Sequence, residues 1–592
     1  MTKYMIDGHR LYDFVASGAQ NLIVNEHNLN RINVFPVADG DTGTNLALTM
    51  KNILTNAKKD LSVKLTMDSI AKVALESAYG NSGMIFAQYL NGLAIEIGDK
   101  ESITQEEFVL ATQSAVRYAY EAVASPKEGT ILTVMKEWSN QLKDNISGEF
   151  EHIFENSLTA AKKMVEQTKY KLKVLLDNDV VDAGAKGFYY FIEGISQFIK
   201  TGSLETLKFK AAQMEEFIEI HPDTNVGEFK YCSQFLVETK KDKAYFQQLL
   251  APYGDSLVVT SKDDHVQVHL HAKSPELVME ALVKEGTVLS HKIDDMQLQA
   301  NLKFQAKNKT VIITDSIADV SKEFLEKENI VVIPLNLIVD STVYLDKLTM
   351  TPDLFYRHLD DYRMNPTSAQ ATIETIERIF NQVLQNTDEI IGIFVSAKMS
   401  GTFNNIQRVV SRMNLEGKKI KLIDSKVNSV AQGLLVSQLA KWRNQGFSFE
   451  ELVEKTEEAI ANTHIYVSVK DLKYMLRGGR VSKVQGFILS KLDLKPVISI
   501  DPQGKGEIYK KTLSQKKAVS LILKKVKEDM DAKGIRTYGL VYADDPNDLT
   551  HFAKQVEQII GKKPAYIEAI SPIVGLNAGK GAFAIGYIKG SS

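Results

Sequence analysis

The segment NVFPVADGDTGTNLAL, residues 33–48, decides how the N-terminal part of the chain is interpreted. One glycine separates Asp39 from Asp41, and a run with helical spacing begins near Thr44. Two carboxylates this close repel each other, and a divalent cation removes that repulsion. Mg²⁺ takes oxygen ligands and shares its shell with substrate phosphates, to which the next helix offers free N–H groups. The alternative is a capped turn without a metal, because Asp-Gly-Asp is also common turn chemistry.

Further along, three more glycine-containing segments interrupt predicted helices. They are GNSG (80–83), PKEGTILT (126–133) and VVDAGAKG (180–187). Each alone is typical of an ordinary helix end, but four such loops in one helical region suggest a rim around a nucleotide. The spacing of apolar residues predicts a helical bundle. Its predicted helices include Met67–Tyr79, Met84–Ile97, Thr104–Ala124 and Leu158–Lys173.

Composition indicates an ordinary globular protein. The chain has 592 residues, the length of about four domains, with 44% hydrophobic and 24% charged residues. A net charge of -3 gives no indication of nucleic-acid binding. Cys232 is the single cysteine, so no disulfide forms within the chain, and a reducing cytoplasm fits. No uncharged apolar run approaches the ~20 residues of a membrane span, so we expect a soluble protein with at most transient membrane-surface contact.

The predicted secondary structure changes character twice along the chain, which predicts three domains: 1–203, 204–308 and 309–592. Strand-like alternation beside one helical segment predicts a small α+β middle domain. The last domain contains five short buried-type strands with helical segments between most of them, which suggests a parallel α/β sheet. These strands are TVIITDS, NIVVIPL, EIIGIFVS, KIKLIDS and RTYGLVYAD.

The middle domain holds a possible metal-binding set. His269 and His271 alternate along one strand and therefore project from one face. Cys232, in another predicted strand, would complete a Cys-His₂ set that leaves a tetrahedral zinc one open position. The alternative is a small buried hydrophobe and a pair of surface histidines.

In their order, the four N-terminal motifs resemble the nucleotide-binding L domain of dihydroxyacetone kinases, in the version found in the kinase subunit of bacterial fatty acid kinase. The resemblance implies an all-α eight-helix barrel that binds ATP through magnesium, with two ions. It makes Asp39 and Asp41 the catalytic magnesium ligands and Asn33 the third ligand. The residues implied to bind the nucleotide are Thr42, Thr44, Asn45, Asn81, Ser82, Gly83, Thr130 and Asp182.

The middle domain resembles that of the same kinase subunit, where a cysteine and an H-x-H pair occupy matching positions. The resemblance favours zinc at Cys232, His269 and His271, and it implies a homodimer. It leaves open whether the metal serves structure or catalysis.

The C-terminal part resembles DegV-type fatty-acid-binding proteins, which implies an α/β domain of two subdomains. The matching motifs include TDSIADVS, PTSAQ, SAKMSGTFNN, DLKYMLRGGRVS and GLNAGKGAFAIGY. Ser-Gly-Thr alone is also an ordinary N-cap cluster. Asn577 stands where the family has a histidine, and an amide cannot carry a proton charge. The residues implied to bind the acyl group are Thr367, Ser368, Ser400, Gly401, Thr402 and Asn577, while Arg477 and Arg480 are implied to contact the kinase domain.

Together, these resemblances imply a fatty acid kinase with its carrier fused in one chain. Such an enzyme would phosphorylate a long-chain fatty acid with ATP, and the acyl phosphate would feed phospholipid synthesis. Its partners would include a separate fatty-acid carrier or an acyltransferase that uses acyl phosphate. Two alternatives stay open: a kinase for another small molecule, such as a hydroxyketone, and a nucleotide-regulated lipid sensor or carrier without turnover.

Overall fold

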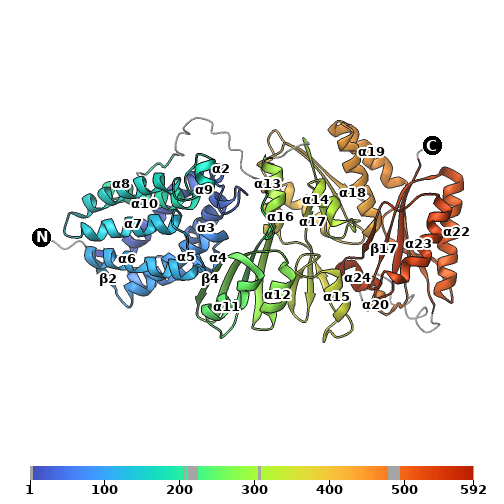
Figure 1. Cartoon of the computed structure of the whole chain (residues 1–592), viewed down its shortest axis with the longest axis horizontal. Coiled ribbons are helices and arrows are strands. Elements are labelled where there is room, and N and C mark those ends of the chain that lie inside the picture. The colour runs from blue at the N-terminus through green and yellow to red at the C-terminus, as the bar shows by residue number, and fades with distance from the viewer. Residues whose placement is uncertain (1–4, 205–206, 211–224, 305–308, 478–493, 591–592) are drawn as a thin grey trace. The chain divides into compact units, whose positions relative to one another are not determined.

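The computed structural model describes residues 5–204, 207–210, 225–304, 309–477 and 494–590. The chain divides into two compact units, Met1–Phe304 and Gln305–Ser592, and each is described by itself (Figure 1). The first unit contains both the helical region and the middle sheet.

Helices build the N-terminal part of the first unit, as the sequence predicts. Predicted helices 67–79, 84–97 and 104–124 are confirmed with small shifts at their ends. The last predicted helix began too late, because the apolar stripe already starts at Phe150, Ile153 and Phe154. The short strands β1 (Met5–Asp7) and β2 (Ser102–Thr104) pair antiparallel. The helices are α1 Gly8–Val24, α2 Glu26–Arg31, α3 Thr42–Asn56, α4 Val63–Ser77, α5 Gly80–Ile97, α6 Gln105–Ala122, α7 Ile131–Asp144, α8 Phe150–Thr168, α9 Lys173–Asp177 and α10 Ala183–Thr201.

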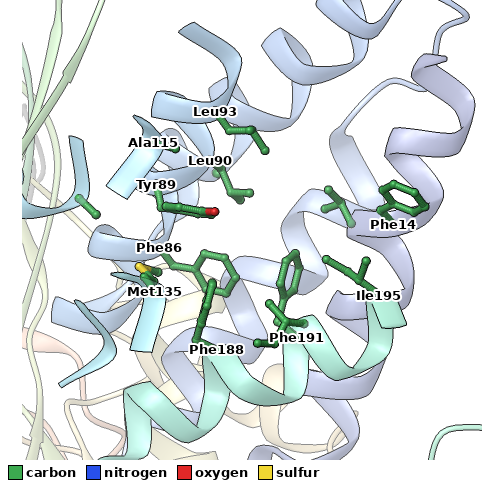
Figure 2. Packing of buried hydrophobic residues seen from close by; sticks show 14 of the residues in the cluster. Phe14, Phe86, Tyr89, Leu90, Leu93, Ala115, Met135, Phe188, Phe191 and Ile195 are labelled. Carbon is green, nitrogen blue, oxygen red and sulfur yellow. The ribbon is translucent and has the colours of Figure 1, made fainter. Parts of the chain in front are cut away.

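Aromatic side chains fill the core between these helices. Figure 2 shows Phe86, Phe188 and Phe191 pointing toward one another, and the ring centroids of Phe86 and Phe191 are 4.8 Å apart. Helices α1 and α10 pack closely because glycines face each other at the crossing. A Cβ on Gly194 would lie 2.5 Å from the carbonyl oxygen of Ser17.

The middle domain is a four-stranded antiparallel sheet with strand order β4-β5-β3-β6, which confirms the α+β prediction. Cys232 lies opposite His271 and Asp294, and Gln234 lies opposite His269 and Lys292. Since side chains alternate along a strand, these six residues share one face of the sheet. The elements are β3 Tyr231–Glu238, α11 Lys243–Leu250, the 3₁₀ turn η1 Ala251–Tyr253, β4 Gly254–Lys262, β5 His265–Ala272, α12 Pro275–Val283, β6 Thr287–Asp295 and α13 Met296–Phe304.

The second unit has an α/β architecture with two main sheets. Four of the five predicted strands form the parallel sheet β13-β12-β7-β8. The fifth, RTYGLVYAD, does not belong there: it forms β17 of a six-stranded sheet, order β16-β15-β14-β19-β17-β18, and runs antiparallel to β19. A strand buried on both faces has the same composition in either sheet, so the sequence could not assign its partner. A third sheet, β10-β9-β11, has three strands.

The strands of this unit are β7 Thr310–Asp315, β8 Val331–Ile333, β9 Asn336–Val339, β10 Thr342–Leu345, β11 Thr367–Ala369, β12 Glu389–Phe394, β13 Lys419–Asp424, β14 Thr463–Ser468, β15 Val497–Ile500, β16 Gly506–Lys510, β17 Ile535–Tyr542, β18 Ile567–Ala569 and β19 Phe583–Lys589. The helices are α14 Lys322–Lys327, α15 Pro352–His358, α16 Ile373–Leu384, α17 Thr402–Val410, α18 Ser429–Asn444, α19 Phe449–Ala461, α20 Lys473–Arg477, α22 Gln515–Lys533, α23 Asn547–Ile560 and α24 Pro572–Ala578. Over the described residues, no helix combines the length and apolar character that a membrane crossing requires.

Candidate functional site

The carboxylate loop is held in shape by Asn33. The Asn33 side chain donates to Asp39 Oδ1 at 3.2 Å and to the carbonyl oxygen of Val37 at 2.8 Å. Its own Oδ1 accepts the backbone N–H of Thr42, the first residue of α3, at 2.9 Å. One buried amide therefore fixes the loop against the start of the helix, and both aspartates enter the same cavity.

The two aspartates are electrostatically strained without a cation. Loss of contact with water and the neighbouring Asp41 raise the pKa of Asp39 well above its usual range, against the opposing effect of Lys303. Burial also raises the pKa of Asp41. A divalent cation relieves this strain, and the carboxylate and amide oxygens are the ligand type that magnesium prefers. The residues present therefore fit the ion that the resemblance implies.

Glycines bring the other predicted loops to the same place. Gly80 has a φ of 64°, and a Cβ there would lie 2.6 Å from the side-chain nitrogen of Asn45. A Cβ on Gly184 would lie 2.6 Å from Ser82 Oγ and 3.4 Å from Ile131 Cβ. Segments 80–83, 126–133 and 180–187 thus converge beside the carboxylate loop, because only glycine permits such close approach.

The predicted nucleotide-binding residues fall into two groups. Those that line the cavity are Thr42, Asn45, Asn81 and Ser82, together with Asn33, Asp39 and Asp41. The Asn81 amide oxygen, an acceptor, is buried without a hydrogen-bond partner among the described residues, so it can accept from a donor group or ligate a cation, but it cannot itself bind a phosphate oxygen.

The second group lies outside the cavity lining. The Thr44 hydroxyl accepts from Asn30 at 2.8 Å and donates to Glu26 at 3.0 Å, so it serves the contact between α2 and α3. Gly83 packs against Thr49. Thr130 donates to the carbonyl oxygen of Lys127, and Asp182 caps α10 by accepting the N–H of Ala185.

The Cys-His-His set is compact and buried. Ligand atoms of Cys232, His269 and His271 all lie within 4.8 Å of one another. Neither ring nitrogen of His269 has a hydrogen-bond partner in the described part of the chain, although the residue is only 1% exposed. Burial lowers the pKa of His269 well below its usual range and that of His271 to about 4, so both imidazoles are neutral, the form that binds a metal. An unsatisfied buried imidazole beside a thiol fits a zinc ion.

The two predicted sites form one cavity. Asp39 and Asp41 line it from the helical side, and Cys232, His269 and His271 line it from the middle sheet. The sheet reaches this position because Gln234 and Gln267 donate to the carbonyl oxygen of Ala78, at 2.5 and 3.1 Å, just before the GNSG loop.

Sequence reasoning missed three residues around this cavity. Gln234 holds the sheet on α5, and Lys292 forms an ion pair with Asp294 at 2.9 Å on the same sheet face. The period-two alternation that relates Cys232 to Gln234 is the signal that could have found the glutamine.

In the second unit, the acyl-site candidates lie on β11, at the start of α17 and on α24. Ser400 Oγ and Thr402 Oγ1 are 2.8 Å apart, and the N–H of Thr402 donates to Ser400 Oγ at 3.2 Å. Gly401 lies directly against Gln370: a Cβ added at Gly401 would be only 2.2 Å from the side-chain nitrogen of Gln370. Thr367 and Ser368 belong to β11, which packs beside α24.

Asn577 lies on α24. Its Nδ2 donates to the carbonyl oxygen of Ile573 at 3.4 Å, and its Oδ1 is buried without a partner among the described residues. The helix is anchored by buried Asp319, which accepts the N–H of Ser571 at 3.0 Å. Of the two predicted domain-contact residues, Arg477 ends α20, and Arg480 lies outside the described residues.

The fold and the cavity therefore define a helical region with a carboxylate loop, completed by a sheet that carries the Cys-His-His set and joined to an α/β unit. Family models match the three parts in order: the DAK2 domain over residues 36–197, the FakA-like middle domain of fatty acid kinase over 228–303, and the DegV family of uncharacterised proteins over 309–590. The chain thus combines a DAK2 domain, a FakA-like middle domain and a DegV-family domain, as the motifs predict.

Similar proteins include protein YloV of Bacillus subtilis, which is 34% identical over 320 residues, 50% of this chain and 56% of YloV. An uncharacterized protein of Staphylococcus haemolyticus is 32% identical over 309 residues, with the same coverage. The chain therefore spans only about half the length of these relatives.

Solved structures similar to the chain include a stearic acid-binding protein from Eubacterium ventriosum, 28% identical with a TM-score of 0.44, over 47% of this chain and 97% of that one. Another is the fatty-acid-binding DegV of Bacillus subtilis, 24% identical with a TM-score of 0.44, over 48% of this chain and 100% of that one.

Proposed function

We propose that the chain is a fatty acid kinase that transfers the γ-phosphoryl group of ATP to a long-chain fatty acid. The observation that carries this proposal is the single cavity in which the Asp39–Asp41 loop of the DAK2 domain meets Cys232, His269 and His271 of the middle domain. A DegV-family domain on the same chain would present the acyl substrate.

The helical side of the cavity suits a nucleoside triphosphate. Asp39 and Asp41 would hold magnesium, which neutralises charge on the phosphates when bound. Asn45, Asn81 and Ser82 would donate hydrogen bonds to the phosphate oxygens, since glycines let the backbone approach closely. A carboxylate acceptor is already ionised at neutral pH, so the transfer needs positioning and no general base.

The sheet side suits a metal close to the transferred group. Cys232, His269 and His271 would hold zinc with one position left open. In the second unit, the hydroxyls of Ser400, Thr402, Thr367 and Ser368 would bind the acyl carboxylate. A homodimer, exchange with a separate fatty-acid carrier and delivery of acyl phosphate to an acyltransferase in the cytoplasm belong to the same proposal.

Trapping of acyl phosphate from oleate or palmitate with hydroxylamine tests the proposal. Wild type should form acyl hydroxamate only with ATP and magnesium. Asp41→Asn should lower the rate about a hundredfold or more, because it removes one of the two carboxylates that would hold the magnesium that neutralises the phosphate charge. Asp99→Asn is the matched control, since Asp99 is exposed and pairs with Lys64 on the surface. Equal rates for Asp41→Asn and wild type would rule out the assigned role.

A nucleotide-regulated lipid sensor is the second candidate, and Asn577 favours it because an amide cannot supply the charge of the family's histidine. The sensor would be favoured if the chain binds both ATP and oleate but forms no acyl hydroxamate, even when a separate fatty-acid carrier is added.

A further inference from the structure

The residues that line the cavity include no cation that could balance the negative charge of a bound nucleotide. A bound triphosphate would place several negative charges beside Asp39 and Asp41, while the twelve residues that line the cavity include neither lysine nor arginine. Of the lysines in the glycine-containing loops, Lys186 lies over the ring of Tyr190 at 5.3 Å, away from this lining. A phosphate-binding cation must therefore come from outside this lining, and Lys292 on the middle sheet is already paired with Asp294 at 2.9 Å.

Lys303, on the last turn of α13, is placed to supply it. Its Nζ donates to the carbonyl oxygen of Asn30 at 2.9 Å, and a Cβ on Gly40 would lie only 2.2 Å from the same nitrogen. The ammonium therefore rests directly on the glycine between the two aspartates.

The lysine keeps donor capacity in this position. An ammonium has three N–H donors, and one is used by Asn30. Within the described residues Lys303 forms no ion pair at 4.0 Å or less, although it is half-buried. A half-buried cation that no carboxylate of the described residues contacts within 4.0 Å, beside a predicted phosphate site, is suited to an incoming anion.

We propose that Lys303 binds a phosphate group of the nucleotide and that, before the nucleotide arrives, its charge competes with magnesium at Asp39 and Asp41. The proposal rests on the proposed function, because it assumes that ATP enters this cavity. The middle domain would then contribute to nucleotide binding as well as to the metal-ligating set.

Calorimetric titration of the full chain tests it, with ATP at saturating Mg²⁺ and with Mg²⁺ alone. Lys303→Met should weaken ATP binding about ten- to hundredfold, the effect of losing a charge-assisted hydrogen bond. The same variant should bind Mg²⁺ more tightly, by about threefold or more, because a repelling charge is removed. A purely structural role would not tighten Mg²⁺ binding.

Three further variants secure the result. Lys303→Arg should stay closer to wild type than Lys303→Met in both titrations, and Lys303→Gln replaces the methionine variant if that one fails to fold. Lys284→Met is the matched control, because Lys284 is exposed and pairs with Glu280 on α12.

The outcomes separate the two proposals. If wild type binds no ATP, the proposed function and this inference both fail. If wild type binds ATP and Lys303→Met binds ATP and Mg²⁺ as wild type does, or loses affinity for both, only the role of Lys303 is overturned.

Discussion

Asp346 is a buried acid that should make stability depend on pH. It is 1% exposed, accepts the N–H of Ile573 at 3.4 Å through Oδ1, and leaves Oδ2 without a partner among the described residues. Burial raises its pKa to about 7, whereas an unfolded chain releases this proton near pH 4. The folded state then binds more protons than the unfolded state, so stability should fall as pH rises from about 4 to about 7 and level off above.

Asp346→Asn should therefore flatten this pH dependence. Between about pH 5 and about pH 8 the wild type should lose about 2 kcal/mol more unfolding free energy than the variant. Urea titrations of the full chain can isolate the second unit if Trp138→Phe is added to both proteins, because Trp442 then reports alone. Parallel pH profiles for the two proteins would contradict the assignment.

Gly80 should be sensitive to a single added methyl group. Alanine there costs about 1 kcal/mol for its positive φ and also displaces Asn45, which lines the cavity. We expect Gly80→Ala to weaken ATP binding about tenfold, measured by the same calorimetry.

Gly202→Ala is the matched control for this prediction. Gly202 has a φ of 72°, and a Cβ there meets nothing within 4 Å, so it bears the backbone cost alone. Equal effects of the two variants on ATP affinity would show that the contact with Asn45 does not matter.

Among the elements, the middle sheet should stiffen the first turn of α5. Gln234 and Gln267 donate to the Ala78 carbonyl, and Gln234 Oε1 also accepts the N–H of Gly80 at 3.4 Å. In Gln234→Ala, hydrogen exchange of amides in residues 80–84 should be about tenfold faster, because bonds worth about 1 kcal/mol are lost.

Gln247→Ala controls for a general loosening of the sheet against the helices. Gln247 makes a similar bond, to the carbonyl oxygen of Glu121 at 3.1 Å, but at the end of α6. Its loss should leave exchange in residues 80–84 unchanged, and faster exchange there in both variants would argue against a specific contact.

Periodicity predicted most elements, since helix and strand spacing are local properties. It began α8 too late and put β17 in the wrong sheet, because the partner strand β19 is distant in sequence. The same distinction between local and distant information holds for the candidate site. Asp39, Asp41, Cys232 and the histidines carry local patterns, whereas Lys303 and the union of both clusters in one cavity depend on packing that no local pattern records.

For the whole molecule, fusion of kinase and carrier should make turnover independent of chain concentration. A tethered domain supplies its substrate at a high effective concentration, whatever the dilution. We expect specific activity of the proposed kinase, with fatty acid prebound, to stay constant over about a thousandfold dilution.

Co-dilution with a separately expressed second unit provides the control. A specific activity that falls on dilution and recovers when residues 309–592 are added would indicate exchange between chains, and the tethering prediction would be wrong.

The contact between Gly40 and Lys303 joins positions that are far apart in the sequence of the first unit. A side chain at position 40 would clash with Lys303, so the residue type allowed at one position depends on the residue at the other. The helical region and the middle domain therefore cannot accept substitutions at these positions independently. Among related sequences, substitutions at the carboxylate loop should therefore be accompanied by substitutions on α13. In a chimera of this DAK2 domain with an unrelated middle domain, we expect the contact between positions 40 and 303 to be lost before the packing of the hydrophobic core is disturbed.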